Sequence, residues 1–387
     1  MLARLRVLLF AAIGGALTGL ISYSFLKGLD WATRTRLAHG WLLWLLPLVG
    51  LAVGAVYFYW GGHAKGGTPY VIEQGHIFTH GVPSRMAPLI WGGSVAGHLA
   101  GASVGREGAA LQMAGSVTDT AARLGRLTDA ERRTLIAASL AGGWGGVFGV
   151  PFTGIAFTLQ MTPKHRWQAL APAVVSAFAA WAVVDALGYD MGVRPQLPAP
   201  SWTLGLPFKL LLAGVCFGLV ARVFVGALHQ VKAKMGHWVK WPPARPIIGA
   251  AATIGLVVLV GRDYLGLSTP LLADAFTGAH ITWYDPLLKL VFTVIALGTG
   301  FVGGEVLPLF VIGGTLGGAI APGMHVPGPL LATTGSVAAF SSAAGVVLTG
   351  LVLTVEQFGW HSLLPAMVIG VTAHFAAGRP GLYVTHH

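Results

Sequence analysis

The chain has 387 residues, of which 55% are hydrophobic and only 10% are charged, and its mean hydropathy is +0.71. A water-soluble domain cannot bury so large an apolar fraction, so the composition predicts a protein of the lipid bilayer. The net charge of +11 does not indicate nucleic-acid binding, because the basic residues fall in short segments beside apolar runs, as they do in loops of membrane proteins.

Ten apolar runs follow one another, most of them near the length that crosses a bilayer. Many of the 56 glycines interrupt them, so we predict broken helices surrounded by protein. The first run reads as a retained helix rather than a signal peptide. We expect an all-α, multi-pass protein of the cell membrane with no separate soluble domain. The runs are 5–26, 41–60, 86–104, 134–160, 167–186, 205–228, 244–261, 286–322, 329–355 and 361–377.

The segment after the second run, 65–70, has the pattern of a helix start. Gly67 and Thr68 precede a proline there, which predicts exposed backbone N–H groups that bind an anion. Further on, His76 and His80 have the spacing of helical metal ligands, but no third ligand accompanies them. We interpret them as loop histidines and expect neither a metal site nor a cofactor.

Glu107 is the first acidic residue embedded in glycine-rich, apolar sequence, and an ionisable group at membrane depth indicates function. Gly105, Arg106 and Gly108 surround it in a turn that leads into a good helix-forming sequence. A helix N-terminus there attracts anions, and glycine lets the backbone approach them closely. An ionised Glu107 can occupy the anion site and a protonated one can leave it, so it is predicted to gate and to carry protons. The structural alternative is a simple ion pair with Arg106.

The second half repeats this design. Glu305 lies 198 positions after Glu107, again behind two glycines, and the N–H groups of Val306 and Leu307 are predicted to bind an anion at a second helix start. A second pair of similar segments, ending at Gln160 and Glu356, has an offset of 196. Similar offsets in the same order indicate two membrane repeats, 1–200 and 201–387, with the site between them. The role of Glu356 stays open.

Four motifs in this order resemble those of the CLC family of chloride channels and halide/proton antiporters. They are Gly105-Arg-Glu-Gly108, the Phe-x-x-Pro-x-x-Gly-x-x-Phe segment 148–157, Gly303-Gly-Glu-Val-Leu-Pro308 and Gly381-Leu-Tyr383. The resemblance implies a fold of two inverted-topology repeats with broken and tilted helices, and a homodimer with one anion pathway per subunit. It also implies that Tyr383 coordinates the anion.

Within the family, the chain is most similar to fluoride/proton antiporters. Proton-coupled chloride members place an inner glutamate where this chain has Gln160 and Met161, and the fluoride type implies proton transfer through Glu305 instead. The chain departs from the usual fluoride pattern at 66–69 and at Leu307. A chloride/proton antiporter and a passive chloride channel therefore remain open alternatives.

An unrelated alternative is an intramembrane serine hydrolase. Ser103 lies in a Gly-x-Ser-x-Gly segment, and His98 is near it in sequence. A nucleophile elbow needs a preceding strand and a general base within reach, and the sequence indicates neither. We therefore expect a transporter and no enzyme.

Overall fold

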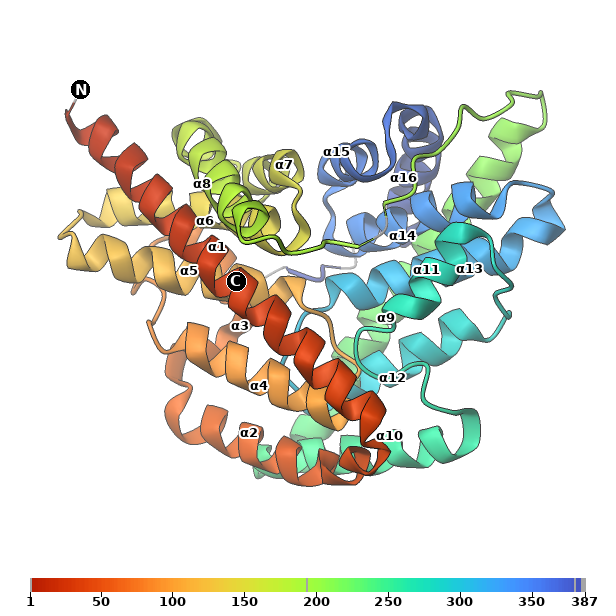
Figure 1. Cartoon of the computed structure of the whole chain (residues 1–387), viewed down its shortest axis with the longest axis horizontal. Helices are drawn as coiled ribbons and strands as arrows, with labels where there is room; N and C mark the ends of the chain where they lie inside the picture. The colour runs from red at the N-terminus through yellow and green to blue at the C-terminus, as the bar shows by residue number, and fades with distance from the viewer. Residues whose placement is uncertain (1, 193, 379–380, 384–387) are drawn as a thin grey trace.

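The computed structural model describes residues 2–192, 194–378 and 381–383. Within these ranges the chain forms sixteen α-helices and no strand, which confirms the all-α prediction (Figure 1). The helices are Leu2–Ala38 (α1), Leu46–Trp60 (α2), Gly67–His76 (α3), Met86–Ala100 (α4), Glu107–Leu124 (α5), Asp129–Phe148 (α6), Pro151–Met161 (α7), Arg166–Ala186 (α8), Leu206–Trp238 (α9), Arg245–Val260 (α10), Thr269–Thr277 (α11), Asp285–Thr299 (α12), Val306–Met324 (α13), Gly328–Ala344 (α14), Val347–Phe358 (α15) and Leu363–Ala377 (α16).

Glycines break the long apolar runs, as predicted. Run 134–160 is two helices, because α6 ends at Gly149 in the left-handed region (φ 63°) and Pro151 begins α7. Gly345 (φ 73°) separates α14 from α15 in the same way. A positive φ is accessible to glycine at little cost, whereas proline fits the first turn of a helix, where no donor is lost.

Some lengths differ from the prediction. Helix α1 extends to Ala38, beyond the expected run 5–26. The basic segment 232–240 was expected to be a loop, but most of it belongs to α9, which continues to Trp238. A helix can continue past its apolar part because long basic side chains can place their charged ends in water or in a polar cavity.

The two halves have matching helix orders. Helices α4 to α8 are followed in the second half by their counterparts α12 to α16, and α7 packs against α15 while α2 packs against α10 (Figure 1). The only residue pairing of β type in the described chain is an antiparallel bridge between Gly105 and Gly304, which hold equivalent places in the two halves. An antiparallel relation between equivalent segments is what inverted-topology repeats give.

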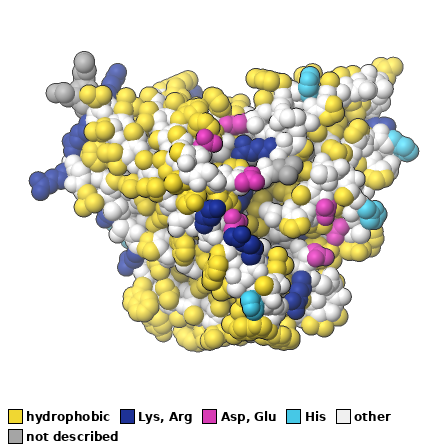
Figure 2. Space-filling view, viewed as in Figure 1, with side chains coloured by type: hydrophobic (Ala, Val, Ile, Leu, Met, Phe, Trp, Pro, Cys, Tyr) yellow, Lys and Arg dark blue, Asp and Glu magenta, His cyan; other side chains and the backbone are white. Residues whose placement is uncertain are grey.

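Seven spans among the described helices are long and apolar enough to cross a membrane: α1, α8, α9, α13 and, with their preceding 3-10 turns, α2, α10 and α16. Hydrophobic side chains cover large parts of the molecular face in Figure 2, while acidic and basic side chains mix near its middle. Helices α5, α6, α13 and α14 lie inside this apolar shell and are mostly buried. Protein therefore surrounds the short, broken helices, as backbone at membrane depth requires.

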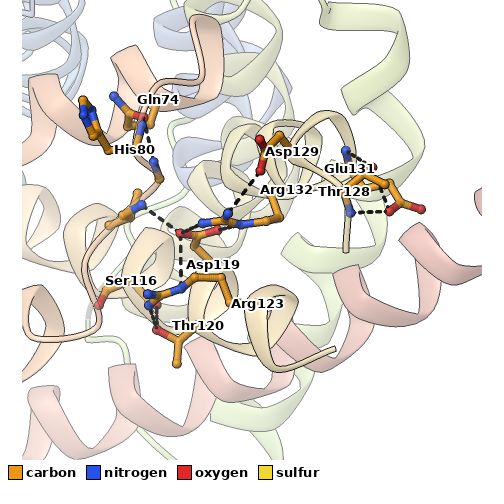
Figure 3. A network of polar contacts seen from close by, with 12 residues as sticks. Gln74, His80, Ser116, Asp119, Thr120, Arg123, Thr128, Asp129, Glu131 and Arg132 are labelled. Atoms are coloured by element: carbon orange, nitrogen blue, oxygen red, sulfur yellow. Dashed lines mark hydrogen bonds and ion pairs between the residues drawn. The ribbon is translucent and has the colours of Figure 1, made fainter. Parts of the chain in front are cut away.

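A polar network fixes the far end of α5 (Figure 3). The fully buried Asp119 accepts hydrogen bonds from Arg132 Nε (2.9 Å) and Nη2 (3.0 Å) and from the Val82 N–H (2.8 Å). Arg123 Nε lies 3.9 Å from the same carboxylate. At the start of α6, Thr128 and Glu131 form a reciprocal capping box. These contacts hold α5 against α6 and against the loop before α4.

Candidate anion site

The two glutamate motifs meet at the bridge between Gly105 and Gly304. The Gly105 N–H donates to the Gly304 carbonyl oxygen (2.6 Å), and the Gly304 N–H donates back (2.8 Å). A methyl group on Gly304 would lie 2.6 Å from the Gly108 nitrogen, so only glycine permits this approach. The bridge brings the N-termini of α5 and α13 together, although they are about half the chain apart.

Glu107 extends from the start of α5 to the start of α13. Its Oε2 accepts a hydrogen bond from the Leu307 N–H (3.0 Å) and one from the Arg106 N–H (3.2 Å). Arg106 Nε lies 3.3 Å from Oε1, and the glutamate is only 2% exposed. An unpaired N–H at a helix start is a natural anion ligand, and here the carboxylate takes that place. The ion pair with Arg106, which is the structural alternative for Glu107, is present as well, and the gating role stays a prediction.

Glu305 lies immediately before α13, close to the start of α3. A methyl group on Gly108 would lie 3.1 Å both from Glu305 Oε2 and from Thr68 Oγ1, so all three residues border one small space. Thr68 Oγ1 donates to the Gly108 carbonyl oxygen (3.1 Å) and accepts from Gln112 Nε2 (3.3 Å). Lys232 is near enough to Glu305 to interact with it electrostatically. A carboxylate, a hydroxyl and a helix start thus converge on this point.

Two cavities border this region, and they share no lining residue among the described residues. The cavity of about 560 Å³ that reaches Glu305, hereafter the Glu305 cavity, is also lined by Gly67, Thr68, Gln112 and Lys232. The other, of about 340 Å³, reaches Arg106 and the Leu307 backbone and is hereafter called the Arg106 cavity. Leu307, whose N–H donates to the Glu107 carboxylate, is one of the residues that line the Arg106 cavity.

Tyr383 is buried behind this site. In the described part of the chain its hydroxyl has no hydrogen-bond partner, while its ring meets Phe157 edge to face at 6.2 Å. Both Glu107 and Glu305 are within electrostatic range of the hydroxyl. A buried hydroxyl without a partner is costly, and a bound anion would satisfy it. All the residues predicted for the anion site, including the buried Val306, therefore lie in one region.

Glu356 has a different place. Its carboxylate accepts hydrogen bonds from Thr153 N–H (2.8 Å), Thr153 Oγ1 (2.6 Å) and Phe152 N–H (3.0 Å), so it caps the start of α7. Gln160 does the same for α15 through Thr349 N–H (2.7 Å). Because a neutral amide fills the equivalent position in the other repeat, capping does not need the charge of Glu356. The geometry gives Glu356 a structural role.

The geometry opposes the serine hydrolase. Ser103 is fully buried, and its hydroxyl is bonded to Lys289 Nζ (2.9 Å) and Thr293 Oγ1 (3.1 Å). His98 is bonded through its two ring nitrogens to the carbonyl oxygens of Ser94 and Val104. The imidazole is therefore not the base of a nucleophile at Ser103. The other two histidines that were singled out lie elsewhere, His76 at the end of α3 and His80 stacked on His63 (4.9 Å).

Sequence reasoning missed several polar residues of the interior. Lys289 is fully buried, and its Nζ donates to Ser103 Oγ, Ser268 Oγ (2.9 Å) and the Gly266 carbonyl oxygen (2.8 Å). Gln112 was passed over although it follows Glu107 on α5. Lys289 could have been identified as a candidate from the sequence, because it lies within the apolar run 286–322 and charged residues are rare at membrane depth.

These features define a multi-pass membrane protein in which the starts of two helices, α5 and α13, meet at a buried carboxylate. The family model described as "Voltage gated chloride channel" matches residues 49–378. The chain belongs to this family, the CLC proteins, and is a multi-pass protein of the cell membrane rather than an enzyme.

Curated relatives match almost the whole chain. The "Chloride/fluoride channel protein" of Pseudomonas syringae pv. tomato is 37% identical, over 97% of this chain and 85% of the relative. The "H(+)/Cl(-) exchange transporter ClcA" of Cronobacter sakazakii is 28% identical, over 98% and 89%.

Solved structures confirm the fold. A "CLC-type fluoride/proton antiporter" superposes with a TM-score of 0.91 and 32% identity, over 96% of this chain and 94% of the other. A "slow cyanobacterial Cl-/H+ antiporter" gives a TM-score of 0.84 at 19% identity, with the same coverage, and supports the fold alone. The predicted CLC-like architecture is therefore correct.

Proposed function

We propose that this protein exchanges fluoride for protons across the cell membrane. The observation that carries the proposal is the hydrogen bond from the Leu307 N–H to the Glu107 carboxylate, which places a titratable anion in the position of a transported one. The solved fluoride/proton antiporter of the same fold and the chloride/fluoride channel protein support fluoride as the substrate.

Glu107 links the two ions in this mechanism. Protonation removes its charge, which weakens its hold on the helix N-termini and frees the Leu307 N–H for a halide. A halide that takes this position also displaces the carboxylate, which can then collect a proton. The Glu107 carboxylate and the halide thus compete for one site, so entry of the halide is linked to proton uptake by Glu107.

The other residues of the anion site have supporting roles in the proposal. The starts of α3, α5 and α13 supply N–H donors, at Gly67, Gly108 and Val306 among others, and Thr68 and Tyr383 supply hydroxyl groups. Glu305 receives the proton on the side of the Glu305 cavity, because Gln160 and Met161 cannot carry one. Fluoride is the smallest halide and the strongest acceptor, so closely spaced donors favour it.

We also propose that two copies form a homodimer, each with its own pathway, and that the repeats divide at about residue 200, in the linker between α8 and α9. Large apolar side chains on α8 and α16 remain exposed in the single chain, such as Trp167, Leu364 and Phe375. A partner or lipid tails must cover them in the membrane. Cross-linking in liposomes at two protein densities tests the dimer, since a stable pair cross-links equally at both.

The decisive experiment measures ion efflux from liposomes that contain the purified protein. Fluoride and chloride gradients are applied separately while internal pH is recorded. The proposal expects fluoride to move faster than chloride and to drive protons in the opposite direction. Equal rates for the two halides would contradict the selectivity, and halide movement without protons would indicate a channel.

Glu305→Gln tests the proton route in the same assay. The amide keeps the size of the side chain but cannot release a proton, so proton pumping is expected to stop. A Glu305→Gln protein that still pumps protons against their gradient would remove Glu305 from the mechanism. Glu356→Gln is the matched control, because the equivalent Gln160 shows that an amide can cap the helix, and it is expected to pump normally.

A further inference from the structure

The Arg106 cavity has an unusual charge distribution. Among the described residues that line it, Arg106 and Arg194 are the charged ones, and none is a carboxylate. Most of the remaining wall is apolar and includes Phe148, Phe310 and Phe358. Apolar walls keep the local dielectric constant low, so the field of the two cations is concentrated inside the cavity.

Arg194 belongs to the linker 187–205, which crosses from the first half to the second (Figure 1). Its Nη2 donates to the Phe148 carbonyl oxygen at the end of α6 (2.6 Å). Three residues later, the Leu197 N–H donates to the Phe358 carbonyl oxygen at the end of α15 (3.0 Å). The linker is thus tied to both repeats, which fixes the guanidinium at the cavity wall while most of its N–H donors remain available.

The two guanidinium groups are close enough to repel each other. Burial lowers the pKa of Arg194, and the charge of Arg106 lowers it further, while the nearby Glu356 opposes both. Glu356 offsets part of the charge of Arg194, but it does not line the cavity, and its oxygen atoms accept the hydrogen bonds of Thr153 and Phe152. Arginine stays charged despite such shifts, so two like charges face one small space.

Glu107 offsets the charge of Arg106 through its contact with the guanidinium (3.3 Å). When Glu107 is protonated or moves away, Arg106 loses that partner and both cations face the cavity. We propose that Arg194 and Arg106 together bind a transported halide in the Arg106 cavity. On the path of the halide, this site comes before the Leu307 N–H, which the Glu107 carboxylate occupies. This inference rests on the proposed function and adds a second, entry-side anion site to it.

The test measures initial halide flux into liposomes over a range of concentrations, using the halide that the wild type transports. Arg194→Gln is expected to raise the half-saturating concentration roughly 5-fold, with the maximal rate nearly unchanged. Arg194→Lys keeps the charge and should recover most of the affinity. Arg166→Gln is the matched control, because it removes an equal charge at the start of α8, away from the cavity lining, and should change neither parameter.

If the role of Arg194 is purely structural, Arg194→Gln should reduce the number of active molecules and leave the half-saturating concentration unchanged. Gln357→Glu separates the two, since Gln357 lines the same cavity and the variant keeps the bond from Arg194 to Phe148. The added negative charge should also raise the half-saturating concentration several-fold. Unchanged affinity in Arg194→Gln or in Gln357→Glu overturns the inference. Failure of the wild type to couple fluoride to protons counts against the proposed function instead.

Discussion

Glu107 and Asp119 lie on the same helix, α5, and both are buried, yet their partners differ in kind. Asp119 is held by two nitrogen atoms of Arg132 and by the Val82 N–H, all within 3.0 Å. Glu107 has backbone N–H groups at 3.0 and 3.2 Å and one arginine nitrogen at 3.3 Å. The first set matches a carboxylate specifically, whereas N–H groups at a helix start accept any small anion.

The difference separates a fixed carboxylate from a displaceable one. Removing the charge of Asp119 leaves the mostly buried Arg132 without its bidentate partner, and a small ion does not reproduce that bidentate geometry. Removing Glu107 from its place leaves donors that a halide can take over. Both residues are acidic and both are buried, so the geometry of their hydrogen-bond donors decides which one is structural and which one can gate.

The largest effect is expected for Glu107→Gln. The amide cannot carry a proton and has no charge with which to compete for the helix start, so anion-driven proton transport should fall below detection. Thermal stability in detergent should change little, because side-chain size is preserved. Proton transport at the wild-type level in folded Glu107→Gln would place the gate elsewhere in the molecule.

Asp119→Asn makes the same chemical change twelve residues further along the helix and should act on stability instead. Its NH2 group would face Arg132 or the Val82 N–H, so donors would meet donors in a buried site. We expect a loss of about 3 kcal/mol or more in the free energy of unfolding. The measurement compares the denaturation of Asp119→Asn with that of Glu107→Gln in detergent. Equal stability of the two variants would remove the distinction between the carboxylates.

The sequence contained part of this contrast. Glycine, proline and a lone glutamate in apolar sequence are local features, and they correctly placed the helix starts at Glu107 and Glu305. The hydrogen bond from Leu307 to Glu107 joins residues 200 positions apart and follows from packing of the two repeats. Lys232 had the appearance of a loop residue because helix α9 extends past its apolar part. Arg194 had no distinguishing feature, since the cavity that it lines is formed by segments from both halves.

Tyr383→Phe should have a smaller effect. The Tyr383 hydroxyl has no partner among the described residues, so its removal costs no protein hydrogen bond and stability should stay within about 0.5 kcal/mol. Loss of one hydrogen bond to a bound anion corresponds to about 1 to 2 kcal/mol, or roughly a 5- to 30-fold weaker affinity. Fluoride titration calorimetry measures this. Unchanged affinity with lowered stability would make Tyr383 a packing residue.

The smallest effect concerns a third carboxylate, Glu131, which is partly exposed in the capping box of α6. The Thr128 N–H donates to Glu131 Oε2 (2.8 Å), and this bond lowers the pKa of the carboxyl. A lowered folded pKa means that the carboxylate stabilises the protein above the ordinary value of about 4.3, and that this contribution is lost as pH falls through the folded pKa.

At pH 7, Glu131→Gln should therefore unfold at a slightly lower temperature than the wild type. The unfolding temperatures of the two proteins should converge between about pH 4 and 3, below the ordinary carboxyl pKa of about 4.3. The difference is expected to be about 1 kcal/mol or less, because solvent screens an exposed cap. Thr128→Ala is the control. It removes the bond from the Glu131 N–H to the Thr128 hydroxyl, which does not titrate, together with the bond from that hydroxyl to the Glu131 carboxylate, so part of its deficit should persist at pH 3. A Glu131→Gln deficit that is the same at pH 7 and pH 3 would show that the cap works through hydrogen-bond geometry alone, in contrast to Glu107, whose charge is proposed to change in every cycle.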